Sequence, residues 1–139
     1  MRPPMLLAGV LLTVPLIAVP ATASAQKTAT GADEFENSCA VCHGEDGRGD
    51  GPLAKVLTVK PADLTQLAKR NDGVFPIEKV SETIDGRTQI TAHGTREMPV
   101  WGARYEAEAS RRYGPYGSEA AVKTRIHLLV RYLQSIQQK

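Results

Sequence analysis

Two cysteines and a histidine are grouped within one short segment, Cys39-Ala40-Val41-Cys42-His43, and the chain has no other cysteine. If the segment is helical, residues three and four apart lie on one face, so both thiols and the imidazole point the same way. This CxxCH pattern is typical of the attachment site of a c-type haem, with two thioether bonds to the porphyrin and the imidazole on the iron. A redox-active or zinc-binding CxxC pair is the alternative interpretation.

An iron bound by His43 has a second axial position, which a methionine or another histidine would fill. Met98 lies in a segment without helical period, and Pro99 restrains the backbone directly after it. His93 is the competing candidate, whereas His127 lies beside the apolar stripe of a predicted helix and is interpreted as a surface residue. We therefore predict His43 and Met98 as the iron ligands, with His93 as the alternative to Met98.

The predicted ligands limit the chemistry of the site. An iron held by an imidazole and a thioether has no free position for a substrate, so it can change oxidation state but cannot bind and transform a molecule. The sequence thus favours electron transfer over an enzyme. An open or His93-filled position would instead indicate a haem sensor or enzyme that binds carbon monoxide or imidazole readily.

The start of the chain has the composition of an export signal. Arg2 precedes the mainly apolar segment Met5–Val19, and Ala23-Ser24-Ala25 provides small residues for cleavage. The apolar run contains Pro15 and is shorter than the ~20 residues of a membrane span, so cleavage after Ala25 is favoured over an uncleaved anchor. We expect a signal peptide over 1–25, a flexible lead over 26–30 and a periplasmic domain over 31–139.

Composition indicates one small domain with a thin core. The chain has 17 Lys and Arg against 15 Asp and Glu, and this near balance gives no sign of binding to nucleic acid or to a charged membrane. Aromatic residues make up only 5% of the chain. A buried porphyrin would supply the missing apolar bulk, so we expect the haem-free chain to fold poorly.

Apolar spacing predicts an all-α domain of short helices and long loops. We expect helices over 31–42, over 61–70 and from Pro76 to Gly86, and a glycine-rich loop over 44–52. A last helix begins at Ser118 as N-cap and has an apolar stripe through Val122, Ile126, Leu129, Val130, Leu133 and Ile136. Residues 87–116 show no sustained period, so we predict a long loop there, with Trp101 as a core aromatic residue.

With these elements placed, the chain resembles a bacterial, exported monohaem class I cytochrome c over roughly residues 31–137. The CxxCH segment near the N-terminus, Met98-Pro99 well downstream and the terminal helix carry the resemblance. It implies a small all-α fold in which the N- and C-terminal helices cross, while short middle helices and long loops wrap around one covalently bound haem c and its iron.

The resemblance also implies particular contacts and partners. The crossing of the terminal helices would involve Gly31, Phe35, Leu129 and Tyr132. The carbonyl of Pro52 would accept the ring N–H of His43 and orient it. Redox proteins would dock transiently at the haem edge near Cys39 and Cys42, through an interface below about 1,200 Å².

Two roles share this chemistry. A monomeric, diffusible periplasmic electron carrier is the first interpretation, and a dedicated cytochrome subunit of a periplasmic dehydrogenase or oxidase is the alternative. Residues 102–117 depart from the simplest members of the resembled family, so their contacts are left open.

Overall fold

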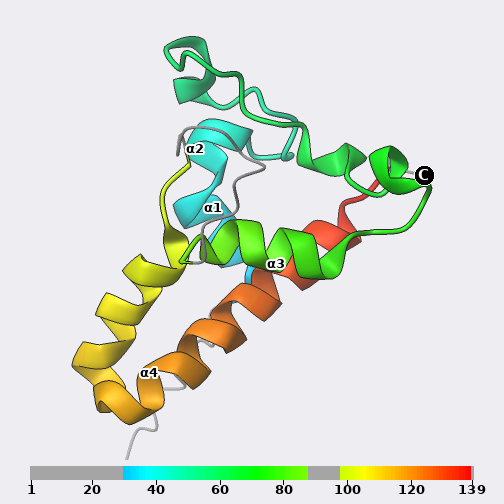
Figure 1. Ribbon diagram of the computed structural model, residues 1–139. Helices are drawn as coiled ribbons and strands as arrows, with labels where there is room; N and C mark the ends of the chain where they lie inside the picture. The colour runs from blue at the N-terminus through cyan, green and yellow to red at the C-terminus, as the bar shows by residue number, and fades with distance from the viewer. Residues whose placement is uncertain (1–29, 88–97, 139) are drawn as a thin grey trace, which may run out of the picture.

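A computed structural model describes residues 30–87 and 98–138, and all the regular secondary structure in these ranges is helical. The expected signal peptide and His93 lie outside the described residues. Figure 1 shows the elements in chain order: α1 (Gly31–Ser38), α2 (Ala40–His43), the short 3-10 helices η1 (Pro52–Lys55), η2 (Leu64–Gln66) and η3 (Lys69–Asn71), α3 (Ile77–Asp85) and α4 (Trp101–Ser135). The expected all-α fold is confirmed.

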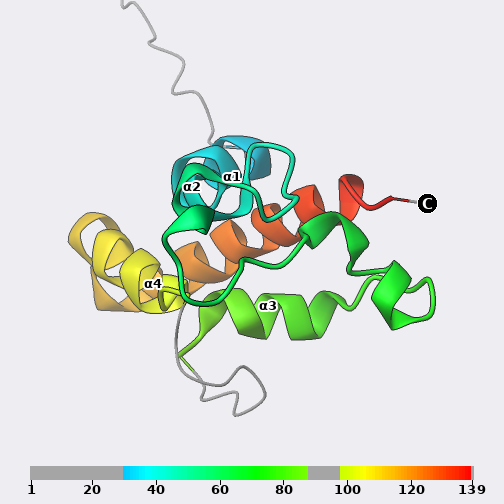
Figure 2. The same ribbon diagram turned by 90° about the horizontal axis from the view of Figure 1, so that it is seen from above.

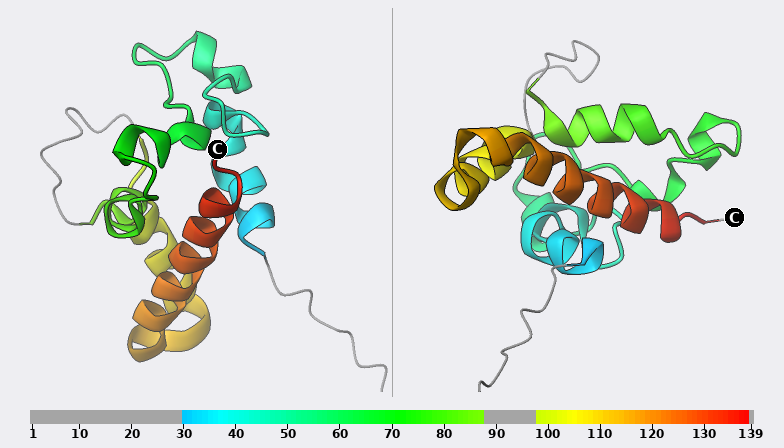
Figure 3. Two further views of the ribbon diagram at one scale, coloured as in Figure 1. Left: turned by 90° about the vertical axis from the view of Figure 1, so that its right-hand side faces the viewer. Right: turned by 90° about the horizontal axis from the view of Figure 1, so that it is seen from below.

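The second half of α4 forms the centre of the domain. It lies between α1 on one side and α3 on the other, as Figures 2 and 3 show from above, from below and from the side. Five residues of the predicted apolar stripe are buried there, Val122, Ile126, Leu129, Val130 and Leu133, whereas Ile136 at the C-cap is only partly buried. They pack against Phe35 of α1 and against Val80 and Ile84 of α3 in one core cluster.

The crossing of α1 and α4 uses the four expected residues. A Cβ atom on Gly31 would lie only 2.1 Å from the carbonyl oxygen of Leu128, so glycine is required for the two backbones to approach this closely. The rings of Phe35 and Tyr132 pack with centroids 5.1 Å apart, and Leu129 is completely buried beside them. The tertiary contact therefore fixes the position of α1, which leads directly to the cysteines.

The N-terminal segment consists of two helices rather than the single predicted helix over 31–42. Thr30 and Asp33 form a capping box that begins α1. Cys39 then separates α1 from α2, because its φ of −118° departs from helical geometry. Its backbone N–H still donates to the carbonyl of Phe35, and its carbonyl accepts from the N–H of His43, so the chain direction is nearly continuous.

Residues 61–70 also differ from the prediction, since only the short turns η2 and η3 form there. The Asp63 side chain accepts hydrogen bonds from the N–H and the hydroxyl of Thr65, which favours a local turn over a longer helix. Asp72 adopts a left-handed conformation with φ of 52° and ends η3. By contrast, α3 forms where it was expected and ends at Gly86, which has φ of 62° as its C-cap, although Pro76 is the N-cap rather than the first helical residue.

The prediction of a loop over 87–116 is wrong from residue 101 onward, because α4 begins at Trp101. Trp101, Tyr105 and Ala109 recur every four residues and are buried, and Trp101 belongs to the core as expected. This stripe is narrow and lies among charged residues, so its periodicity is weak in the sequence.

A sharp turn at Gly114 divides α4 into two halves that fold back on each other as a helical hairpin (Figure 1). Gly114 has φ of 70° and ψ of 178°, a conformation adopted almost only by glycine. Pro115 follows in the first turn of the second half, where it costs no hydrogen bond. Ser118 therefore is not the N-cap: its hydroxyl donates to the carbonyl of Pro115 within the helix. Among the described helices, none combines the length and the apolar character that a membrane span needs.

Candidate functional site

The loop after α2 folds back onto the cysteine-histidine segment. The N–H of Gly49 donates to the carbonyl of His43 at 2.7 Å, and the N–H of Gly51 donates to the carbonyl of Cys42 at 3.1 Å. A Cβ atom on Gly51 would lie 2.6 Å from the carbonyl oxygens of Ala40 and Val41. The glycine-rich loop, predicted from sequence, thus lies in close backbone contact with α2 and holds its C-terminal end.

Both cysteines are half-buried free thiols. Burial, the nearby Glu34 carboxylate and Cys42 together raise the pKa of Cys39 to about 12, with burial as the largest cause. Cys39 is therefore a neutral thiol at neutral pH. A redox-active CxxC pair depends on a lowered thiol pKa, so this environment disfavours the thiol oxidoreductase interpretation.

The imidazole of His43 is oriented by a single hydrogen bond. Its Nδ1 lies 3.0 Å from the carbonyl oxygen of Ala62, and because a carbonyl only accepts, Nδ1 carries the proton. The lone pair is then on Nε2, which is the arrangement of a histidine that ligates a metal. Burial lowers the pKa of His43 more than the bond to Ala62 raises it, so the ring is neutral at neutral pH.

The expected acceptor for His43, the carbonyl of Pro52, is replaced by that of Ala62. Pro52 begins η1 immediately after the loop, whereas residues 61–62 return to α2 from further along the chain. Gly49 permits this return, since a Cβ atom there would lie 2.3 Å from the carbonyl oxygen of Pro61. The loop is therefore longer than the resemblance implied, and the acceptor role moves with it.

The remaining candidate ligands are Met98, His127 and His93. Met98 is partly buried and packs against the same core cluster as Cys39, three residues before α4 begins. His127 is exposed on α4, in agreement with its interpretation as a surface residue. His93 lies outside the described residues.

The residues present fit a c-type haem by their chemistry. Cys39 and Cys42 supply two thiols one turn apart, and His43 supplies an imidazole whose Nε2 is available to iron. Large apolar side chains are exposed on the segment that follows the glycine-rich loop, where an apolar ligand would cover them: Leu53, Val56, Leu57 and Val59.

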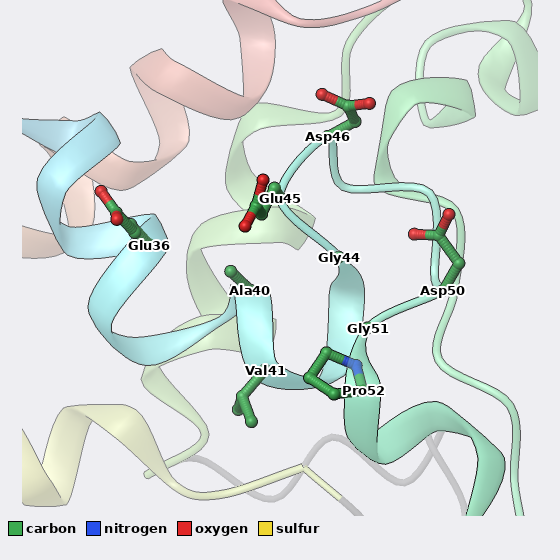
Figure 4. Close-up of a pocket in the computed structure, with 9 residues that line it drawn as sticks. All are labelled: Glu36, Ala40, Val41, Gly44, Glu45, Asp46, Asp50, Gly51 and Pro52. Carbon is green, nitrogen blue, oxygen red and sulfur yellow. The ribbon is translucent and has the colours of Figure 1, made fainter.

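A depression beside α2 is distinct from this donor set. Figure 4 shows side chains that line it: the apolar Ala40, Val41 and Pro52 and the carboxylates of Glu36, Glu45, Asp46 and Asp50. Neither cysteine lines it, and neither His43 nor Met98 does. It borders the predicted attachment segment, since Ala40 and Val41 lie between the two cysteines.

Sequence reasoning missed a buried charged network next to the cysteines. Glu34 is only 6% exposed and contacts Ser38, Tyr105 and Arg125. The burial of Glu34 could have been predicted from the sequence, because Glu34 shares a helical face with Gly31 and Phe35, and that face is the buried one.

Residues 26–112 of the chain match the family model described as cytochrome c oxidase, cbb3-type, subunit III. The match includes the CxxCH segment, Met98 and the first half of α4. No curated protein and no solved structure matches the chain.

Proposed function

The chain belongs to the cytochrome c family described as cbb3-type oxidase subunit III, and from that premise we propose that it transfers single electrons through a haem c attached at Cys39 and Cys42. His43 and Met98 are the proposed iron ligands. When bound, the haem supplies an iron that alternates between the ferrous and ferric states. One observation carries the proposal. His43 directly follows Cys42, and its Nδ1 is hydrogen-bonded to the Ala62 carbonyl, so Nε2 is free to bind iron.

The chain's own residues give the site its electron-transfer character. The Ala62 carbonyl fixes the ring of His43 and increases the basicity of Nε2. Met98 offers a soft thioether, which favours the ferrous state. If His43 and Met98 both bind the iron, no position would be left for a substrate, which supports a carrier rather than an enzyme.

The periplasm is the proposed location, and a diffusible monomer is the proposed form. The composition of residues 1–25 supports export and cleavage after Ala25. Redox partners would dock at the haem edge near Cys39 and Cys42.

A dedicated subunit of an oxidase complex is the second candidate, and the description of the matching family favours it. Both candidates use the same chemistry, but they differ in how long the chain stays bound to its redox partner. Size-exclusion chromatography of the native membrane and soluble fractions separates them. A haem-stained monomer in the soluble fraction supports the carrier, whereas stable co-elution with oxidase subunits supports the complex.

Axial ligation is tested by optical and low-temperature magnetic resonance spectra of the ferric protein. We expect Met98→Ala to lose the signature of methionine ligation and to bind carbon monoxide or imidazole, while the control His127→Ala keeps the wild-type spectrum. An unchanged Met98→Ala spectrum together with an altered His93→Ala spectrum would assign the second position to His93 instead.

A further inference from the structure

A buried carboxylate lies next to the first haem-attaching cysteine. Glu34 accepts hydrogen bonds from the Ser38 hydroxyl at 2.6 Å and from the Tyr105 hydroxyl at 2.9 Å, both at Oε1. The Arg125 guanidinium donates to both of its oxygens, at 2.5 Å and 3.1 Å. The side chain of Glu34 is only 7% exposed. Burying a charge is costly unless it is fully paired, so this arrangement is a specific one.

Arg125 compensates the charge and joins three helical segments. It projects from the second half of α4, reaches Glu34 on α1 and donates to Glu108 on the first half of α4 at 2.6 Å. Its guanidinium also lies 4.0 Å from the ring centroid of Tyr105. The hairpin of α4 therefore places Arg125 and Tyr105 beside Glu34, and these groups keep its carboxylate ionised.

The charge of Glu34 acts on the attachment segment. Ser38, which donates to Glu34, directly precedes Cys39 in the chain. This hydrogen bond therefore holds the Glu34 carboxylate against the residue that directly precedes the proposed attachment point. Screening by solvent is weak at such a buried position, so a charge there acts more strongly than one on the surface.

We propose that Glu34 and Arg125 together set the reduction potential of the haem, Glu34 lowering it and Arg125 limiting the decrease. This inference rests on the proposed attachment of haem at Cys39. Reduction adds one electron, delivered by the partner redox protein, and removes one positive charge from the iron. A nearby carboxylate favours the more positive ferric state, and a nearby guanidinium favours the ferrous state.

The test is a redox titration of the purified holoprotein at neutral pH. We expect Glu34→Gln, which keeps the shape of the side chain, to increase the ferrous-to-ferric ratio at a fixed ambient potential by roughly tenfold, about 59 mV for a one-electron couple. Arg125→Gln should change the ratio in the opposite direction, and Arg125→Lys, which keeps the charge, should stay near the wild type.

Glu108→Gln is the matched control, because it removes a carboxylate from the same network on the far side of Arg125. Its shift should be smaller than that of Glu34→Gln. A purely structural role would destabilise both the Glu34 and the Arg125 variants without giving potentials of opposite sign. Equal potentials in Glu34→Gln and the wild type, or a decrease in Glu34→Gln, would overturn the inference.

A second variant covers the case in which Glu34→Gln does not retain haem. Tyr105→Phe keeps every charge but removes one donor from the carboxylate, so it should lower the potential. An unchanged or raised potential in that variant counts against the inference. Failure of the proposed function looks different, since the wild-type mass would then lack a covalent haem.

Discussion

The ring of Phe35 in α1 packs on the ring of Tyr132 in α4, with centroids 5.1 Å apart and planes inclined by 44°. One turn earlier, Gly31 lies against the backbone of Leu128. This contact joins segments almost 100 positions apart in sequence and sets the direction in which α1 delivers Cys39 to the site.

Gly31→Ala should separate the two helices. The new Cβ atom would lie 2.1 Å from the Leu128 carbonyl oxygen, which is backbone and cannot rotate away. We expect a loss of about 1–3 kcal/mol in the free energy of unfolding, measured by denaturant titration of the holoprotein. Ala32→Ser, on the exposed face of the same helix, is the control and should change stability little.

Gly49→Ala should disturb the orientation of His43. A Cβ atom there would lie 2.3 Å from the carbonyl oxygen of Pro61 and displace the adjacent acceptor, Ala62. We expect an altered haem spectrum and a lower thermal midpoint. Gly73→Ala is the matched control, because Gly73 also has positive φ but no atom lies near its added Cβ. If both variants lose stability equally and keep the wild-type spectrum, backbone strain explains the effect and the clash does not.

The Glu34 network should make the protein sensitive to acid. Burial raises the pKa of Glu34, but hydrogen bonds from Arg125, Ser38 and Tyr105 together outweigh burial and hold it below the ordinary value of 4.5. The resulting stability is fully present above pH 4.5 and is lost as pH falls through the lowered pKa. The advantage of wild type over Glu34→Gln in urea denaturation should therefore shrink below pH 4.5. A difference that stays constant from pH 7 to pH 3 would contradict this.

Removal of the haem should remove most of the fold. In Cys39→Ser/Cys42→Ser protein the proposed thioether bonds cannot form, so we expect the exposed apolar residues of the 53–59 segment to lack a ligand that covers them. A ligand that binds only the folded state contributes to its stability, so we expect the far-ultraviolet circular dichroism of this variant to lose most of its helical signal. A native-like spectrum without haem would show that the polypeptide core is sufficient on its own.

The sequence predicted features that depend on local spacing. Each correct prediction used residues within one or two turns of each other. These predictions are the grouping of the CxxCH side chains, the C-cap at Gly86 and the buried stripe from Val122 to Leu133. The resemblance to cytochromes c correctly gave the α1–α4 crossing at Gly31, because short motifs carried it. The ligand role of Met98 stays a prediction.

Weak or conflicting local signals led to the errors. The first half of α4 has a buried stripe at Trp101, Tyr105 and Ala109 that is too narrow to stand out among charged neighbours. Residues 61–70 have apolar spacing that favours a helix, but the Asp63 side chain bonds locally to Thr65 and a turn forms instead.

By itself, the sequence determined that two thiols and an imidazole lie together, because they are neighbours along the chain, and it thereby predicts which groups bind the haem. Only the tertiary structure decided what surrounds them. The Ala62 carbonyl reaches His43 from 19 positions away, and Arg125 reaches Glu34 from 91 positions away. Such contacts depend on how loops and helices pack in space, and no periodicity within a short segment encodes them.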